Sequence, residues 1–73
     1  MIMGEIERNP TEVIRISLES FKGRDYVDLR IYYQDDAGEW KPTKKGVTIA
    51  PDKVDDAIEH LKAAKEELSK KAK

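Results

Sequence analysis

Cationic side chains alternate with aromatic ones between Phe21 and Gly46, and this stretch holds the residues best suited to chemistry. It has no nucleophile paired with a base, no cluster of metal ligands and no glycine-rich phosphate loop. Lysine and arginine pair with phosphates, and flat aromatic rings stack on unpaired bases. The combination therefore points to a surface for a flexible polyanion with flat bases, which is the chemistry of single-stranded nucleic acid.

The charge balance of the whole chain argues against a general nucleic-acid binder. The 73 residues include 14 basic and 15 acidic side chains, for a net charge of −1, whereas nucleic-acid-binding domains are usually basic. Residues 21–46 carry six basic against five acidic side chains. Any basic groove must therefore be made by the fold, with acids and bases separated onto different sides.

No set of residues predicts catalysis. His60 is the one histidine, and its place beside the apolar stripe of a predicted helix is typical of a solvated residue. The serines have no candidate base, and the carboxylates of Asp35 and Asp36 are too few for a cation-binding loop. There is no cysteine, which excludes disulfides and cysteine-type zinc sites. We therefore expect a protein that is not an enzyme and holds no metal and no cofactor.

Alternation of apolar and polar residues predicts strands in the middle of the chain. It is clearest over residues 12–21 and 25–34, where apolar side chains, most of them β-branched, recur at every second position. Lys22-Gly23-Arg24 connects these two strands tightly, because Gly23 can take a positive φ. Asp35-Asp36-Ala37-Gly38 ends the second of them and predicts a type I turn followed by a left-handed residue.

The ends of the chain complete a single predicted domain, residues 1–73. Ile2 and Ile6 indicate a brief first strand. Residues 39–49 indicate a fourth strand, interrupted after Pro42 by a loop that bears lysines, since proline marks an edge or a bulge. A helix is predicted over residues 51–69, and we expect residues 1–4 and 70–73 to fray.

The predicted helix has an apolar stripe that cannot hide the sheet by itself. Four strands present more apolar width than one helix can cover, and the stripe repeats at close to 3.5 residues, as in a helix–helix seam. We therefore expect a homodimer. The alternative is a monomer whose helix lies on its own sheet. The candidate interface residues are Val54, Ile58, Leu61 and Leu68.

No targeting or membrane segment is predicted. No apolar run approaches the roughly 20 residues that span a bilayer, and Met1–Glu5 lacks the basic start and apolar core of a signal peptide. We expect an intracellular protein that does not bind membranes.

Three segments resemble the single-stranded-DNA-binding domain of the transcriptional positive cofactor four (PC4-like) family. They are Phe21–Arg24, Val27–Tyr33 and Asp35–Gly46, and with the helix that follows Pro51 they extend the resemblance over residues 12–68. It implies an α+β fold: a four-stranded curved antiparallel sheet followed by one C-terminal helix, homodimeric, with a groove. It also implies a non-catalytic protein that binds single-stranded or melted DNA with little sequence preference and acts as a transcription coactivator or regulator, possible partners including the transcription machinery.

The resemblance carries the family's DNA contacts onto particular residues. Tyr33 stands where the family has a stacking tryptophan, so one stacking ring is smaller here. Lys44 is an additional basic position, and Trp40 either adds a stacking surface or fills the edge of the core. The implied contacts are Phe21, Lys22, Arg24, Arg30, Tyr33, Lys41, Lys44 and Lys45.

Some features depart from the family pattern. Strict alternation places Arg30 and Tyr33 on opposite faces, so a shared groove needs a bulge, a strong twist or an early strand end. The negative net charge predicts weaker and more salt-sensitive binding than a basic relative would show. The chain lacks the long N-terminal region of eukaryotic members, so a compact bacterial-type member is expected. It would be cytoplasmic and nucleoid-associated in a bacterium, or nuclear in a eukaryote.

Two other functions remain open from the sequence. A protein-interaction adaptor would use the same aromatic residues as binding hot spots. RNA could replace DNA as the ligand, because stacking and phosphate contacts serve both.

Overall fold

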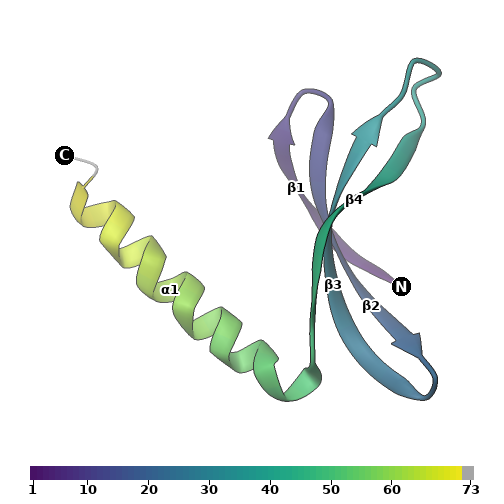
Figure 1. Cartoon of the computed structure of the whole chain (residues 1–73). Helices are drawn as coiled ribbons and strands as arrows, with labels where there is room; N and C mark the ends of the chain where they lie inside the picture. The colour runs from purple at the N-terminus through teal and green to yellow at the C-terminus, as the bar shows by residue number, and fades with distance from the viewer. Residues whose placement is uncertain (72–73) are drawn as a thin grey trace.

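The computed structural model describes residues 1–71 and has four antiparallel strands followed by one long helix (Figure 1). The strands lie in the order β1-β2-β3-β4, so each pairs with its neighbour in sequence. The predicted α+β order of four antiparallel strands and a C-terminal helix is confirmed. The elements are β1 (Ile2–Asn9), β2 (Glu12–Phe21), β3 (Arg24–Gln34), β4 (Trp40–Ile49), the 3₁₀-helix η1 (Pro51–Lys53) and α1 (Val54–Lys71).

The β2–β3 hairpin is the regular centre of the sheet. Its turn consists of Lys22 and Gly23, with φ of 53° and 78°, and positive φ at both central residues is what a two-residue type I′ turn requires. The ladder then runs without irregularity from the Phe21–Arg24 pair to the Glu12–Tyr33 pair. The turn therefore fixes which residues of the two strands face each other.

The β3–β4 turn has the predicted form. The Gly38 N–H donates to the Asp35 carbonyl at 3.0 Å, and Gly38 has a φ of 82°. The Asp35 carboxylate accepts the N–H groups of Glu39 and Ala37, both at 2.9 Å, and pairs with the Lys41 ammonium at 3.1 Å. The hydrogen bond from Glu39, and then the one from Lys41, hold the pKa of Asp35 below its ordinary value.

The fourth strand differs from its prediction. β4 is one continuous strand, and the interruption is a bulge rather than a loop. Tyr32 pairs with Pro42 and Arg30 pairs with Gly46, so residues 43–45 lie opposite Ile31 alone. The edge position of β4 explains why Pro42 is tolerated there.

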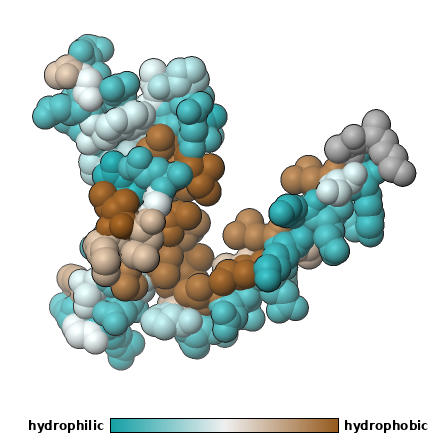
Figure 2. Space-filling model, turned by 180° about the vertical axis from the view of Figure 1, so that it is seen from behind, coloured by the Kyte–Doolittle hydropathy of each residue, from teal (hydrophilic) through white to brown (hydrophobic). Residues whose placement is uncertain are grey.

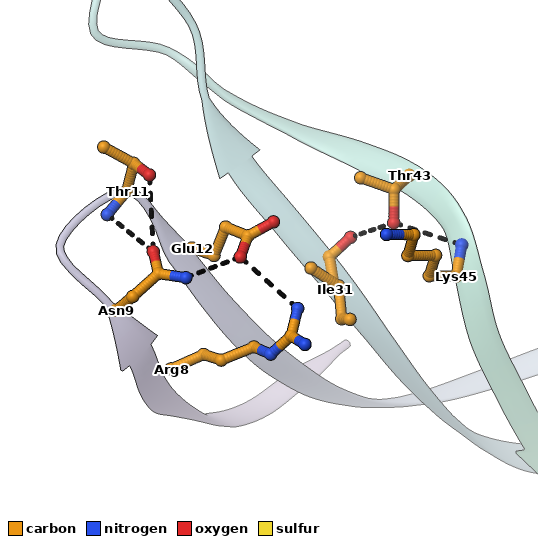
Figure 3. Close-up of polar contacts among 7 residues, drawn as sticks. All are labelled: Arg8, Asn9, Thr11, Glu12, Ile31, Thr43 and Lys45. Carbon is orange, nitrogen blue, oxygen red and sulfur yellow. Dashed lines mark hydrogen bonds and ion pairs between the residues drawn. The ribbon is translucent and has the colours of Figure 1, made fainter.

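β1 is longer than the sequence predicts. Residues 2–4, where we expected a frayed end, belong to the strand, and Met1 exchanges two backbone hydrogen bonds with Leu18 at 2.8 and 2.9 Å. The turn to β2 is held by Asn9, which accepts from Thr11 and donates to Glu12 at 2.6 Å (Figure 3). Fraying was also expected at residues 70–73. Lys70 and Lys71 form the last residues of α1, and residues 72–73 lie outside the described part of the chain.

The helix does not cover the sheet. α1 runs away from the strands after η1 (Figure 1), and none of its side chains is buried. Among residues 1–71 no hydrophobic side chain is buried, and Ser17, 7% exposed, is the one buried residue. The alternative in which the helix lies on its own sheet is therefore wrong for a single chain. No helix of this part of the chain is long and apolar enough to cross a membrane.

The uncovered apolar surface is continuous. Figure 2 shows it gathered over the sheet and continuing along one side of the helix. It includes exposed Leu18 and Val47 on the strands and Ile58, Leu61 and Leu68 on the helix.

The first turn of the helical segment is a 3₁₀ turn instead of the predicted helical turn, and Ala50 before it provides no side-chain cap.

Candidate nucleic-acid interface

The strand register sorts the candidate residues onto two faces, because paired residues of neighbouring strands point the same way. Phe21 pairs with Arg24, and Arg15 pairs with Arg30, so these residues share one face, which we call the polar face. Tyr33 lies on the opposite, apolar face. β3 has no bulge against β2, so the expected separation of Arg30 and Tyr33 holds, although the sheet twists strongly along its length (Figure 1).

The tip of the β2–β3 hairpin presents an aromatic ring with a cation beside it. Phe21 is 64% exposed although it ends a strand. The Lys22 ammonium lies 5.3 Å from the centre of its ring, within the range of a cation–π contact. Lys22 and Arg24 have no ion-pair partner in the described part of the chain. A ring and two unpaired cations are therefore available together.

Arg30 is held in place by its own sheet. Its Nε and Nη2 donate to the two oxygens of Asp28 at 3.2 and 3.1 Å, and Nη1 donates to the Thr43 carbonyl at 3.0 Å. The hydrogen bond to Asp28 raises the pKa of Arg30 above its ordinary value. The guanidinium therefore ties β3 to the bulge, and Asp28 offsets part of its charge.

The bulge in β4 presents two lysines. The Thr43 hydroxyl donates to the Ile31 carbonyl at 2.7 Å and accepts the Lys45 N–H at 3.1 Å (Figure 3). These bonds replace the ladder bonds that the register shift removes. Lys44 and Lys45 are exposed, and neither forms an ion pair within residues 1–71.

The remaining candidates lie at the far end of β3 and β4. Lys41 pairs with Tyr33 across the ladder, and its ammonium is engaged by Asp35. Trp40 pairs with Gln34, which places its ring on the polar face, 38% exposed. Trp40 therefore shares a face with Tyr32 and Arg30, whereas Lys41 lies with Tyr33 on the apolar face.

Comparison with known proteins places the chain in a family. The family model described as Transcriptional Coactivator p15 (PC4) matches residues 8–60, more than half of the chain. The chain belongs to the PC4 family. A crystal structure of BPSL1147, a PC4 homologue from Burkholderia pseudomallei K96243, has a TM-score of 0.84 and 32% sequence identity, covering 89% of this chain and 88% of that one.

Two further similar proteins are a yeast coactivator and a relative solved in complex with DNA. The RNA polymerase II transcriptional coactivator SUB1 of Saccharomyces cerevisiae is 36% identical over 47 residues. That match spans 63% of this chain but 16% of the yeast protein. The structure of MoSub1 in complex with DNA has a TM-score of 0.64 and 28% identity, covering 96% of this chain and 86% of that one.

Sequence reasoning missed one cation on the polar face of this PC4-family sheet. The Arg15 guanidinium lies 4.0 Å from the centre of the Tyr32 ring, and its Nε donates to Glu5 at 2.6 Å. Arg15 is also directly opposite Arg30. The two-residue turn at Lys22-Gly23 was the signal that could have found it, because this turn sets the register of the whole hairpin.

The four predicted interface residues of the helix all remain available to a partner. Val54 is partly exposed, while Ile58, Leu61 and Leu68 are 45%, 67% and 68% exposed.

Gly46 is expected to be the glycine of the sheet least tolerant of substitution. A Cβ at this position would lie 2.8 Å from the Leu29 carbonyl oxygen and 3.0 Å from Cζ of Arg30, so backbone and guanidinium must both move. We expect Gly46→Ala to lower the free energy of unfolding by about 1–3 kcal/mol, as overpacking does, measured by urea unfolding at fixed protein concentration. Gly4→Ala is the matched control, since nothing lies within 4 Å of its Cβ. Equal stability of the two variants would contradict the close approach at Gly46.

Proposed function

We propose that this PC4-family protein is a non-catalytic homodimer that binds single-stranded DNA with little overall sequence preference and acts as a transcription coactivator or regulator. The observation that carries the proposal is the polar face, where the exposed ring of Phe21 lies with unpaired Lys22 and Arg24. The DNA complex of the relative MoSub1 supports DNA as the ligand. On this proposal the protein works wherever the cell keeps its DNA, in the nucleoid of a bacterium or the nucleus of a eukaryote.

Each group has a role that its surroundings suggest. Unpaired lysines and arginines bind phosphates and release counterions, while exposed rings stack on bases of any sequence. Arg30 holds the bulge and donates its remaining N–H groups to a phosphate. Lys41 leaves its ion pair with Asp35 and pairs with a phosphate instead. The proposed contacts are Phe21, Lys22, Arg24, Arg30, Tyr33, Lys41, Lys44 and Lys45, with Trp40 as a further stacking ring.

The proposal includes a second copy of the chain as partner. The apolar face of the sheet and the stripe on α1 are left uncovered in one copy, and a domain without a buried core is not expected to be stable. A two-fold dimer would bury the helix stripe and the apolar face around Leu18 and Val47, and would leave the end of that face at Tyr33 and Lys41 open to DNA. Two polar faces would then hold two strands or one looped strand.

The test is fluorescence anisotropy with a labelled thymine oligomer of about 20 nucleotides and its duplex, over a salt series. We expect tighter binding to the single strand, and the log–log salt slope of Lys45→Ala to be shallower by about 0.7, the value for one phosphate contact on a single strand. Lys62→Ala, which removes the same charge from α1, should leave the slope unchanged. A matching RNA oligomer reports whether the sugar matters. No binding at low salt, or equal slopes for both variants, would contradict the proposal.

A further inference from the structure

A hollow opens beside Phe21, between the tip of the β2–β3 hairpin and the start of the helical segment. Its volume is about 620 Å³, within the range of small-molecule sites. Aromatic, basic and acidic groups meet in it. The residues that matter here are Phe21, Tyr26, Arg24, Pro51, Asp25 and Asp52.

The two acids in this hollow distinguish it from a phosphate site. Neither Asp25 nor Asp52 has an ion pair or a side-chain hydrogen bond within residues 1–71. Ionised carboxylates only accept hydrogen bonds and repel phosphate. Arg24 and Lys22 can then hold the phosphates at the rim, and a strand that crosses this point is expected to direct a base towards the two carboxylates.

The chemistry of the base edge decides which base fits. Cytosine and adenine present an amino group, and guanine also has an amino donor, whereas thymine presents a carbonyl and a methyl group at the corresponding position. An aspartate accepts from such an amino group, as it does from cytosine N4 in DNA recognition. A thymine carbonyl placed against Asp25 or Asp52 would set acceptor against acceptor. The one donor of an unpaired thymine, N3–H, lies between two carbonyl oxygens that repel a carboxylate, whereas an amino group projects beyond the ring.

We propose that this hollow is a nucleobase subsite that selects an amino-bearing base over thymine, with Phe21 and Tyr26 as its aromatic wall and Asp25 and Asp52 as acceptors. The inference rests on the proposed single-strand binding and adds a ligand preference to it. The rest of the polar face stays indifferent to sequence, so the preference is confined to the base that occupies the hollow.

The experiment compares cytosine and thymine oligomers of about 20 nucleotides by anisotropy, at mildly alkaline pH where both bases are neutral. We expect the cytosine oligomer to bind about fivefold tighter, the effect of one net hydrogen bond. An oligomer of 5-methylcytosine separates the two differences between these bases, because it keeps the methyl group of thymine and carries the amino group of cytosine. It should bind like cytosine.

Three variants assign the preference to the carboxylates. Asp25→Asn and Asp52→Asn should reduce the cytosine-to-thymine ratio towards one, because an amide donates as well as accepts. Asp36→Asn in the β3–β4 turn removes the same charge away from the hollow and should keep the ratio. All three residues are exposed, so the fold should survive the changes, which circular dichroism checks.

The outcomes separate this inference from the proposed function. Equal binding of cytosine and thymine oligomers overturns the subsite and leaves single-strand binding intact. A 5-methylcytosine oligomer that binds like thymine, or a ratio that both hollow variants leave unchanged, also overturns it. If no oligomer binds at all, the proposed function fails, and the subsite fails with it.

Discussion

Replacing Leu61 by glutamate is expected to dissociate the protein and unfold it together. Leu61 is 67% exposed in one copy, and in the proposed dimer it lies in the helix seam. Burying a leucine contributes about 1.5–3 kcal/mol, and this loss occurs twice per dimer. Because no hydrophobic side chain is buried in residues 1–71 of one copy, the dissociated chain has no core to keep it folded.

Sedimentation and circular dichroism at several protein concentrations measure this effect. The unaltered protein should melt at a temperature that rises with its concentration, as coupled folding and association require. Ala63→Glu adds the same charge to an exposed helix position outside the predicted seam, and should cost about 0.6–1.5 kcal/mol through its like-charged neighbours Glu59, Glu66 and Glu67. A Leu61→Glu variant that stays folded as a monomer would show that the sheet needs no partner.

Replacing Phe21 by alanine is expected to weaken binding to single-stranded DNA while leaving stability almost unchanged. Stacking contributes about 1–3 kcal/mol per base, which corresponds to a loss of roughly 5- to 150-fold in affinity. The ring is mostly exposed, so its removal leaves no cavity. Anisotropy titration and thermal unfolding of the same sample measure the two effects.

Phe21→Trp is the control for this variant, because it keeps a stacking surface and should retain most of the affinity. Trp40→Ala and Tyr33→Ala in the same assay test the end of the sheet opposite Phe21, where the Trp40 ring lies on the polar face and the Tyr33 ring on the apolar face. Unchanged affinity in Phe21→Ala would remove the hairpin tip from the binding surface.

The sequence predicts the parts of this fold that local rules determine. Alternation identifies β2 and β3 because each strand has one apolar face. Lys22-Gly23 and Asp35–Gly38 identify their turns because only particular residues tolerate those backbone angles. The resemblance adds that these elements form one antiparallel sheet followed by a helix, which the structure confirms.

The parts that escaped prediction depend on contacts between strands. The sequence predicts a loop where β4 has a bulge, because the bonds that hold the bulge cross between strands: the Thr43 hydroxyl donates to the Ile31 carbonyl, and the Arg30 guanidinium donates to the Thr43 carbonyl. Arg15 was missed because its role depends on the residue opposite it. β1 was predicted too short because Gly4 and its charged neighbours give no alternation, although β2 pairs with them.

The junction between sheet and helix determines how far apart the two polar faces of the proposed dimer can lie. α1 is joined to the strands by a single 3₁₀ turn. The turn is closed by backbone hydrogen bonds from Lys53 to the Ala50 carbonyl at 2.9 Å and from Val54 to the Pro51 carbonyl. The helix then runs away from the sheet (Figure 1). Because the sheet does not hold the helix, the direction of α1 in the proposed dimer is set by its contacts with the helix of the second copy. In the proposed dimer the distance between the two proposed DNA-binding surfaces is then a property of the helix seam, and substitutions there are expected to re-space the surfaces without altering a proposed contact residue.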